Sequence, residues 1–329
     1  MKKKQLLIPL LIILALLVQC STGPGRNNRI SFTLPEKKSV MLSNGETYAY
    51  LEQLPDGFEN SGEIILLIHG NNASSVHFAP LFSGLDGVHI IAPDLRGFGD
   101  SSYNEGFSSL SELAEDVKLF ADALGISKAH VAGWSMGGGV AMELAVLYPD
   151  MVSSLFLIQG VGYKGMPFLK ANDDGSYEPY AKREELAQLS PVASQLEAFQ
   201  VQDPSFFRQS WGLSVYTNKK PSAAENSVYI GETLKQRCLL DVYWAMFWFN
   251  MSSEHNGYVH GLGTVSLINC PVALTCADND LLVPPAIIME TAAAIPGSRL
   301  LEYRKCGHSP MVDMPQQLAA DIINHTGLR

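Results

Sequence analysis

A chain of 329 residues, 47% hydrophobic and 17% charged, is long enough to bury a large core without disulfide or metal staples. Its formal net charge of −10 argues against nucleic acid as a partner and mildly disfavours strongly anionic substrates. This composition suits one globular α/β domain with an insertion.

The first twenty residues predict an export signal rather than part of the fold. Three lysines at positions 2–4 precede an apolar run, 6–18, that is too short to span a membrane comfortably. The run ends at Gln19-Cys20-Ser21 and resembles a bacterial lipoprotein signal, which would make Cys20 the lipidated residue. A plain secretory signal or an uncleaved anchor is the alternative, since Gln19 replaces the usual small residue. We expect an exported protein that faces the cell envelope or the exterior and meets the membrane only through this segment.

Beyond a predicted tether at 21–38, apolar runs alternate with amphipathic stretches. Short continuous runs predict strands at 40–42, 48–51, 64–68, 88–92, 129–132, 155–158, 271–276 and 299–303. Residues 111–124 predict an amphipathic helix that stops at Gly125. Strands that alternate with helices imply a parallel sheet, whose functional loops lie at the carboxyl ends of the strands.

The pentapeptide Gly133-Trp134-Ser135-Met136-Gly137 lies between the predicted strand 129–132 and a helix-like segment at 138–148. Strand, sharp turn and helix form a nucleophile elbow, on which the serine hydroxyl projects from the backbone. Flanking glycines allow strand and helix to approach closely, and the helix N-terminus favours negative charge. A glycine-rich turn that occurs by chance is the alternative.

A nucleophilic serine needs a base, and in an elbow protein the chain order is serine, acid, histidine. His308 follows the strand 299–303 on a glycine-containing loop. The strand 271–276 runs into a loop with two candidate acids, Asp278 and Asp280. Five other histidines are expected to be structural or solvated: His69, His77, His89, His130 and His325. The spacing of His255 and His260 does not indicate a metal site.

Several stretches together resemble the α/β-hydrolase family over about 39–323. They are 68–71 (IHGN), 92–101 (APDLRGFGDS), the elbow, 280–284 (DLLVP) and 307–310 (GHSP). The resemblance implies a mostly parallel eight-stranded sheet with helices on both faces. It favours Asp280 as the acid and His308 as the base. It also assigns the oxyanion hole to the backbone N–H groups of Asn71 and Met136.

The strand pattern stops between 162 and 266, where aromatic residues become frequent. The family carries a helical cap at this place, after the sixth strand. The resemblance therefore divides the chain into a signal segment (1–20), a tether (21–38), the first part of the hydrolase core (39–161), a cap (162–266) and the second part of the core (267–329). The aromatic residues either form the core of the cap itself or line the substrate cleft.

These residues predict a serine hydrolase that cleaves small or medium apolar carboxylic esters through an acyl-enzyme. No cofactor and no metal are expected. A serine nucleophile argues against dehalogenase and epoxide hydrolase activity, because serine would form an ether that cannot be hydrolysed. A cofactor-free perhydrolase or a carbon–carbon bond hydrolase could use the same triad. An exported binding protein without turnover is the alternative from another class.

The four cysteines besides Cys20 allow disulfides in an exported protein: Cys238, Cys270, Cys276 and Cys306. In this family the strands that lead to the acid and to the base are neighbours. Their spacing of about 4.8 Å is compatible with a bridge between Cys276 and Cys306. Two buried thiols are the alternative.

Overall fold

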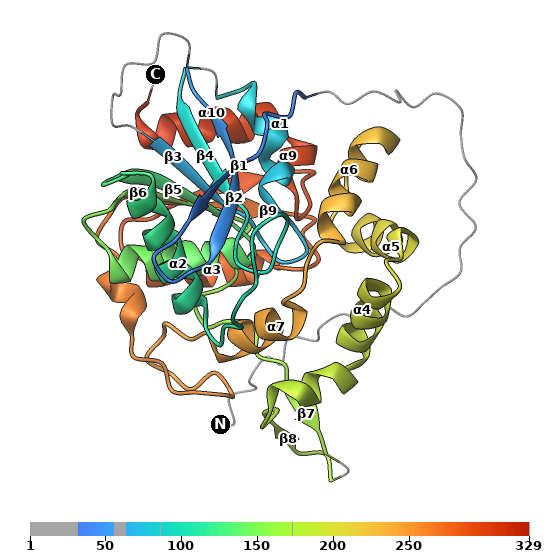
Figure 1. Cartoon of the computed structure of the whole chain (residues 1–329). Helices are drawn as coiled ribbons and strands as arrows, with labels where there is room; N and C mark the ends of the chain where they lie inside the picture. Colours follow the sequence, from blue (N-terminus) through green and yellow to red (C-terminus); the bar gives the residue numbers. More distant parts are fainter. Residues whose placement is uncertain (1–31, 56–63, 86, 173, 329) are drawn as a thin grey trace.

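The computed structural model describes residues 32–55, 64–85, 87–172 and 174–328 (Figure 1). The predicted signal segment, Cys20 and most of the tether lie outside these residues. An eight-stranded sheet has the strand order β1-β2-β4-β3-β5-β6-β9-β10. Its strands are β1 (Lys38–Met41), β2 (Thr47–Gln53), β3 (Ile64–Ile68), β4 (His89–Pro93), β5 (Ala129–Trp134), β6 (Val152–Ile158), β9 (Val272–Ala277) and β10 (Arg299–Tyr303).

The sheet confirms the predicted fold class. Only the pairs β1–β2 and β2–β4 are antiparallel, and the pairs from β4 through to β10 are parallel. Every residue of β3 is buried, as expected for a continuous apolar run in a sheet covered on both faces. Alternate residues of β3 belong to different cores. Ile64, Leu66 and Ile68 join one apolar cluster, while Ile65 and Leu67 join the other.

Helices cover both faces of the sheet (Figure 1). The first cluster packs α2 (Leu110–Ala123), α3 (Met136–Leu147) and α8 (Pro285–Ala294) against one face. The second packs α1 (Ala79–Phe82) and α10 (Pro315–Thr326) against the other. The helix α2 begins one residue before its predicted start, because the Ser109 side chain accepts the Glu112 N–H and caps it.

The insertion follows the sixth strand, β6. It contains β7 (Lys170–Ala171), β8 (Tyr177–Glu178), η2 (Arg183–Gln188), α4 (Ser190–Gln200), α5 (Pro204–Ser214), α6 (Ala223–Thr233), α7 (Leu239–Trp248) and η3 (Thr264–Leu267). Figure 1 shows α4, α5 and α6 along one side of the molecule, apart from the sheet, with β7 and β8 at one end of this row. Two shorter elements complete the fold: η1 (Ser75–Phe78) directly precedes α1 in the chain, and α9 (Pro310–Asp313) precedes α10.

The aromatic residues of the insertion pack partly with one another and partly in the two core clusters of the sheet, Phe249 in the first of these. Phe247 and Tyr258 belong to a small apolar cluster of the insertion itself. Phe207 and Trp211 instead join the core cluster that contains Trp134 of β5. The insertion therefore has a core of its own and is also anchored on the sheet beside the elbow. No helix of the described residues is long and apolar enough to cross a membrane.

The predicted disulfide between Cys276 and Cys306 is wrong, since both residues are free thiols. Cys276 lies opposite Glu302 in the β9–β10 register, so Cys306 falls beyond the end of the paired strands. Cys276 also packs in one apolar cluster and Cys306 in the other, on opposite faces of the sheet. Burial raises the pKa of each thiol.

Candidate active site

Ser135 occupies a sharp turn between β5 and α3. Its backbone has φ 56° and ψ −122°, a conformation that is strained for a non-glycine residue. Three backbone hydrogen bonds hold it there: its N–H donates to the Ile158 carbonyl at 3.0 Å, and its carbonyl accepts from the Gly138 and Val161 N–H groups, both at 2.9 Å. The helix begins at Met136, two residues earlier than predicted, directly after the serine.

The two glycines of the pentapeptide allow backbones to approach closely. A Cβ at Gly133 would lie 2.2 Å from the Gly137 carbonyl oxygen, and a Cβ at Gly137 would lie 2.2 Å from the Ile68 carbonyl oxygen. Neither position can hold a larger residue without moving the backbone. The glycine spacing is therefore a steric requirement of the elbow.

His308 and Asp280 form a buried pair. The His308 Nδ1 and Asp280 Oδ2 atoms are 2.8 Å apart, and the two residues are 3% and 4% exposed. The other carboxylate oxygen of Asp280 accepts the N–H groups of Leu282 and Val283 at 2.8 and 2.9 Å. These contacts fix the carboxylate and leave Oδ2 for the histidine.

Asp278, the competing acid, lies elsewhere. Its side chain is exposed and accepts the Cys306 N–H at 3.2 Å. It holds the loop before His308 without reaching the imidazole. Of the two carboxylates left open by the sequence, Asp280 is the one that contacts His308.

Trp134 connects this pair to the elbow. Its indole Nε1 donates to the His308 carbonyl at 2.7 Å, and the two rings lie 5.7 Å apart. Within the described residues, no hydrogen bond joins Ser135 to His308. Catalytic hydrogen bonds are often long or misaligned before substrate binds, so this geometry is compatible with a base beside the serine.

The predicted oxyanion loop lies against the serine. A Cβ at Gly70 would be 2.8 Å from the Ser135 Cβ and 3.4 Å from its Oγ, so only glycine fits there. Asn71 follows Gly70 in the chain, and Met136 is the first residue of α3. In the part of the chain that the structure describes, neither the Asn71 nor the Met136 N–H donates to a protein acceptor.

Two other histidines near the site are structural, in agreement with the prediction. His69 Nε2 accepts the Leu95 N–H at 2.9 Å, and burial lowers its pKa. His77 is stacked on Tyr229, accepts the Ser74 N–H, and has its pKa lowered by burial to about 3. A histidine that stays neutral in an aromatic stack, without a carboxylate partner, is poorly suited as the base.

Residues of the insertion that the sequence does not predict also contact the site. The Thr217 hydroxyl donates to the Asn279 carbonyl at 2.8 Å and packs against Gly307, so it contacts the loops of both the acid and the base. Gln236 binds Asn71 and Asn72 on the oxyanion loop. Single threonine or glutamine residues in an irregular insertion have no spacing pattern that could mark them.

Comparisons with known proteins agree with this architecture. The family model described as alpha/beta hydrolase fold matches residues 63–315. Lipase 1 of Psychrobacter immobilis is 25% identical over 287 residues, which are 86% of this chain and 82% of that protein. A membrane phospholipase A, described as a novel bacterial virulence factor, has a crystal structure that matches with a TM-score of 0.65 at 25% identity, covering 89% of this chain and 87% of that one. The esterase EaEST of Exiguobacterium antarcticum matches in fold, with a TM-score of 0.68 at 17% identity, over 89% of this chain and 100% of its own.

Proposed function

Since the chain belongs to the α/β-hydrolase family, we propose that it is a serine hydrolase that cleaves small or medium apolar carboxylic esters. The observation that carries the proposal is the buried Asp280–His308 pair beside an elbow serine with φ 56°. The lipase and phospholipase names of two relatives at 25% identity support an ester as the substrate.

The proposed reaction runs through an acyl-enzyme. Ser135 Oγ attacks the acyl carbon while His308 Nε2 takes its proton, and Asp280 holds the imidazole in the tautomer that leaves Nε2 unprotonated. The Asn71 and Met136 N–H groups donate to the oxyanion of the tetrahedral intermediate. His308 then protonates the leaving alcohol, and water releases the acid by the same steps in reverse. A panel of chromogenic esters of rising acyl length tests this proposal, and no turnover of any of them would contradict it.

Ester hydrolysis is expected to decline as the pH falls from neutral into the mildly acidic range. A His308 that has bound a proton cannot accept one from Ser135, so the active fraction falls as His308 becomes protonated. The measurement is kcat/KM against pH with an ester that does not itself titrate. A flat profile over this range would contradict the assignment of His308 as the base.

We also propose that the protein is an exported lipoprotein held at the membrane through Cys20. The support is the lysine-rich start, the apolar run 6–18 and the cysteine at its end. Cys20→Ala is expected to move the protein from the membrane fraction to the soluble fraction after cell fractionation. Ser21→Ala is the matched control and should stay with the membrane. Cys20→Ala protein that stays fully membrane-bound would instead indicate an uncleaved anchor.

A further inference from the structure

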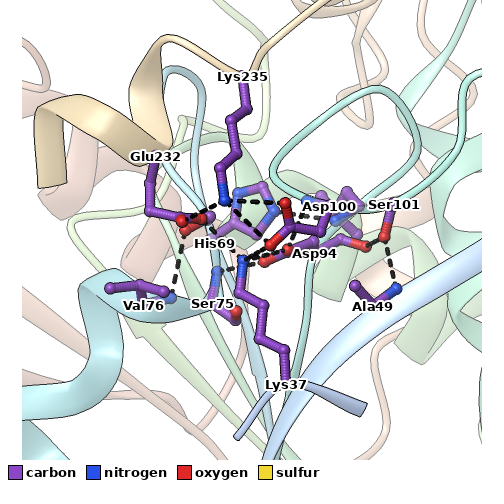
Figure 2. Close-up of polar contacts among 12 residues, drawn as sticks. Lys37, Ala49, His69, Ser75, Val76, Asp94, Asp100, Ser101, Glu232 and Lys235 are labelled. Carbon is purple, nitrogen blue, oxygen red and sulfur yellow. Dashed lines mark hydrogen bonds and ion pairs between the residues drawn. The ribbon is translucent and has the colours of Figure 1, made fainter. Parts of the chain in front are cut away.

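A lysine at the end of the tether occupies the centre of a group of carboxylates. Lys37 Nζ lies 2.8 Å from Asp94, 2.7 Å from Asp100 and 2.8 Å from Glu232 (Figure 2). The side chain of Lys37 is 18% exposed and that of Asp94 is fully buried. Lys235 adds a second ammonium, 2.8 Å from Asp100 and 2.6 Å from Glu232.

The three carboxylates come from different parts of the fold. Asp94 and Asp100 lie on the loop after β4, whereas Glu232 lies in the last turn of α6. Burial alone would lower the pKa of Lys37, but these carboxylates outweigh burial and raise it above its ordinary value. The charged Lys37 therefore binds the insertion to the core. The acidic oxygens all lie within 4.8 Å of one another, and of the two lysines only Lys37 contacts all three carboxylates, including the buried Asp94.

The last turn of α6 and the residues just after it make a second set of contacts, on the oxyanion loop. The Thr233 hydroxyl donates to the Asn72 carbonyl at 2.7 Å. Gln236 binds with both ends of its amide: Oε1 accepts the Asn72 N–H at 2.9 Å, and Nε2 donates to Asn71 Oδ1 at 2.8 Å. Gln236 is 5% exposed, so water does not readily replace these bonds.

The two sets of contacts alternate along one short stretch of chain. Glu232 and Lys235 belong to the charged group around Lys37, while Thr233 and Gln236 hold the oxyanion loop. A shift of this stretch would therefore move the Asn71–Asn72 peptide. Asn72 has a φ of 58°, a left-handed conformation that asparagine adopts more readily than most other residues, and its backbone N–H and carbonyl are both bonded to this stretch.

We propose that Gln236 is a positioning residue that orients the Asn71 N–H so that it can donate to the oxyanion. Lys37 holds Gln236 in place by binding the end of α6 to the core. The inference rests on the proposed function. If this is right, the end of the tether contributes to catalysis, because Lys37 belongs to the tether and directly precedes β1.

The first test is Gln236→Met, which keeps the length of the side chain and removes both hydrogen bonds. We expect kcat for a p-nitrophenyl ester to fall about 10-fold to 100-fold with KM within about twofold, because a misplaced donor weakens transition-state binding. A fluorophosphonate should still label the full number of sites, only more slowly. Gln195→Met is the matched control: Gln195 accepts from the Asn72 side chain, not from its backbone, and its loss should change kcat less than threefold.

The second test compares neighbouring lysines in the full chain. Lys37→Met should lower kcat in the same way, and Lys37→Arg, which keeps the charge, should restore most of it. Lys38→Met is the control, because Lys38 pairs with Glu52 at the exposed edge of β1. Equal kcat for Lys37→Met and Lys38→Met would overturn the role of Lys37.

The readouts separate a positioning role from a structural one. The positioning role is wrong if Gln236→Met keeps the wild-type kcat, or if its number of labelled sites falls in proportion to its kcat. In either case, normal labelling of the wild-type protein would leave the proposed function intact. A wild-type protein that neither reacts with the fluorophosphonate nor hydrolyses any ester would overturn the proposed function and this inference with it.

Discussion

Ser135→Ala is expected to lower kcat for ester hydrolysis by about 10⁵-fold or more, because it removes the hydroxyl that we propose forms the acyl-enzyme. The residual rate would come from the oxyanion hole and substrate binding alone. The measurement is kcat with the best ester of the panel, at enzyme concentrations high enough to detect the residual activity.

The fold should survive this substitution. Alanine at position 135 keeps the backbone at φ 56° and removes one half-buried hydroxyl, so the free energy of unfolding should change by less than about 1 kcal/mol. Denaturant unfolding of both proteins provides this control. Hydrolysis by Ser135→Ala within about tenfold of wild type would contradict the nucleophile assignment.

Asp280→Asn is expected to lower kcat by about 10⁴-fold. The asparagine oxygen can still accept the Leu282 and Val283 N–H groups, which leaves its NH₂ facing His308. An NH₂ group cannot accept from Nδ1, so the imidazole is driven to the tautomer whose Nε2 carries the proton. That tautomer cannot take the proton of Ser135.

Asp278→Asn is the matched control for this experiment, two residues away in the same loop. Its carboxylate is exposed and accepts backbone N–H groups, such as that of Cys306, which an asparagine oxygen can also accept, so kcat should change less than about threefold. If Asp278→Asn is the inactive variant and Asp280→Asn remains active, the assignment of the acid is wrong.

The sheet was predictable because its central strands are buried on both faces. A short, continuous apolar run rich in β-branched residues, such as 64–68, is typical of a strand buried on both faces, and the structure places β3 at these same residues. The helix after Ser135 was predicted two residues late, because Gly137 to Gly139 are poor helix formers. The close packing of Gly137 on Ile68 and His69 favours glycine there despite its low propensity.

The site was predictable where a motif follows a strand. The pairing of His308 with Asp280 follows from two neighbouring parallel strands, β9 and β10, whose carboxyl ends meet. The residues alone left Asp278 and Asp280 open and the family resemblance favoured Asp280, which is the carboxylate that contacts the imidazole in the structure.

Other features depend on tertiary contacts that have no local sequence pattern. The roles of Lys37 and Gln236 arise only when the tether, the loop after β4 and α6 come together. The disulfide prediction failed for a related reason. Strand adjacency was inferred correctly, but which face of the sheet each cysteine occupies depends on the end of β10 and the turn after it.

The most direct test of the central claim is to treat the folded protein with a fluorophosphonate and map the adduct by peptide mass spectrometry. The account predicts one adduct per chain, on Ser135, that is absent from Ser135→Ala and from protein unfolded before treatment. An unlabelled Ser135 in protein that still hydrolyses esters, or an adduct on another residue, would contradict it.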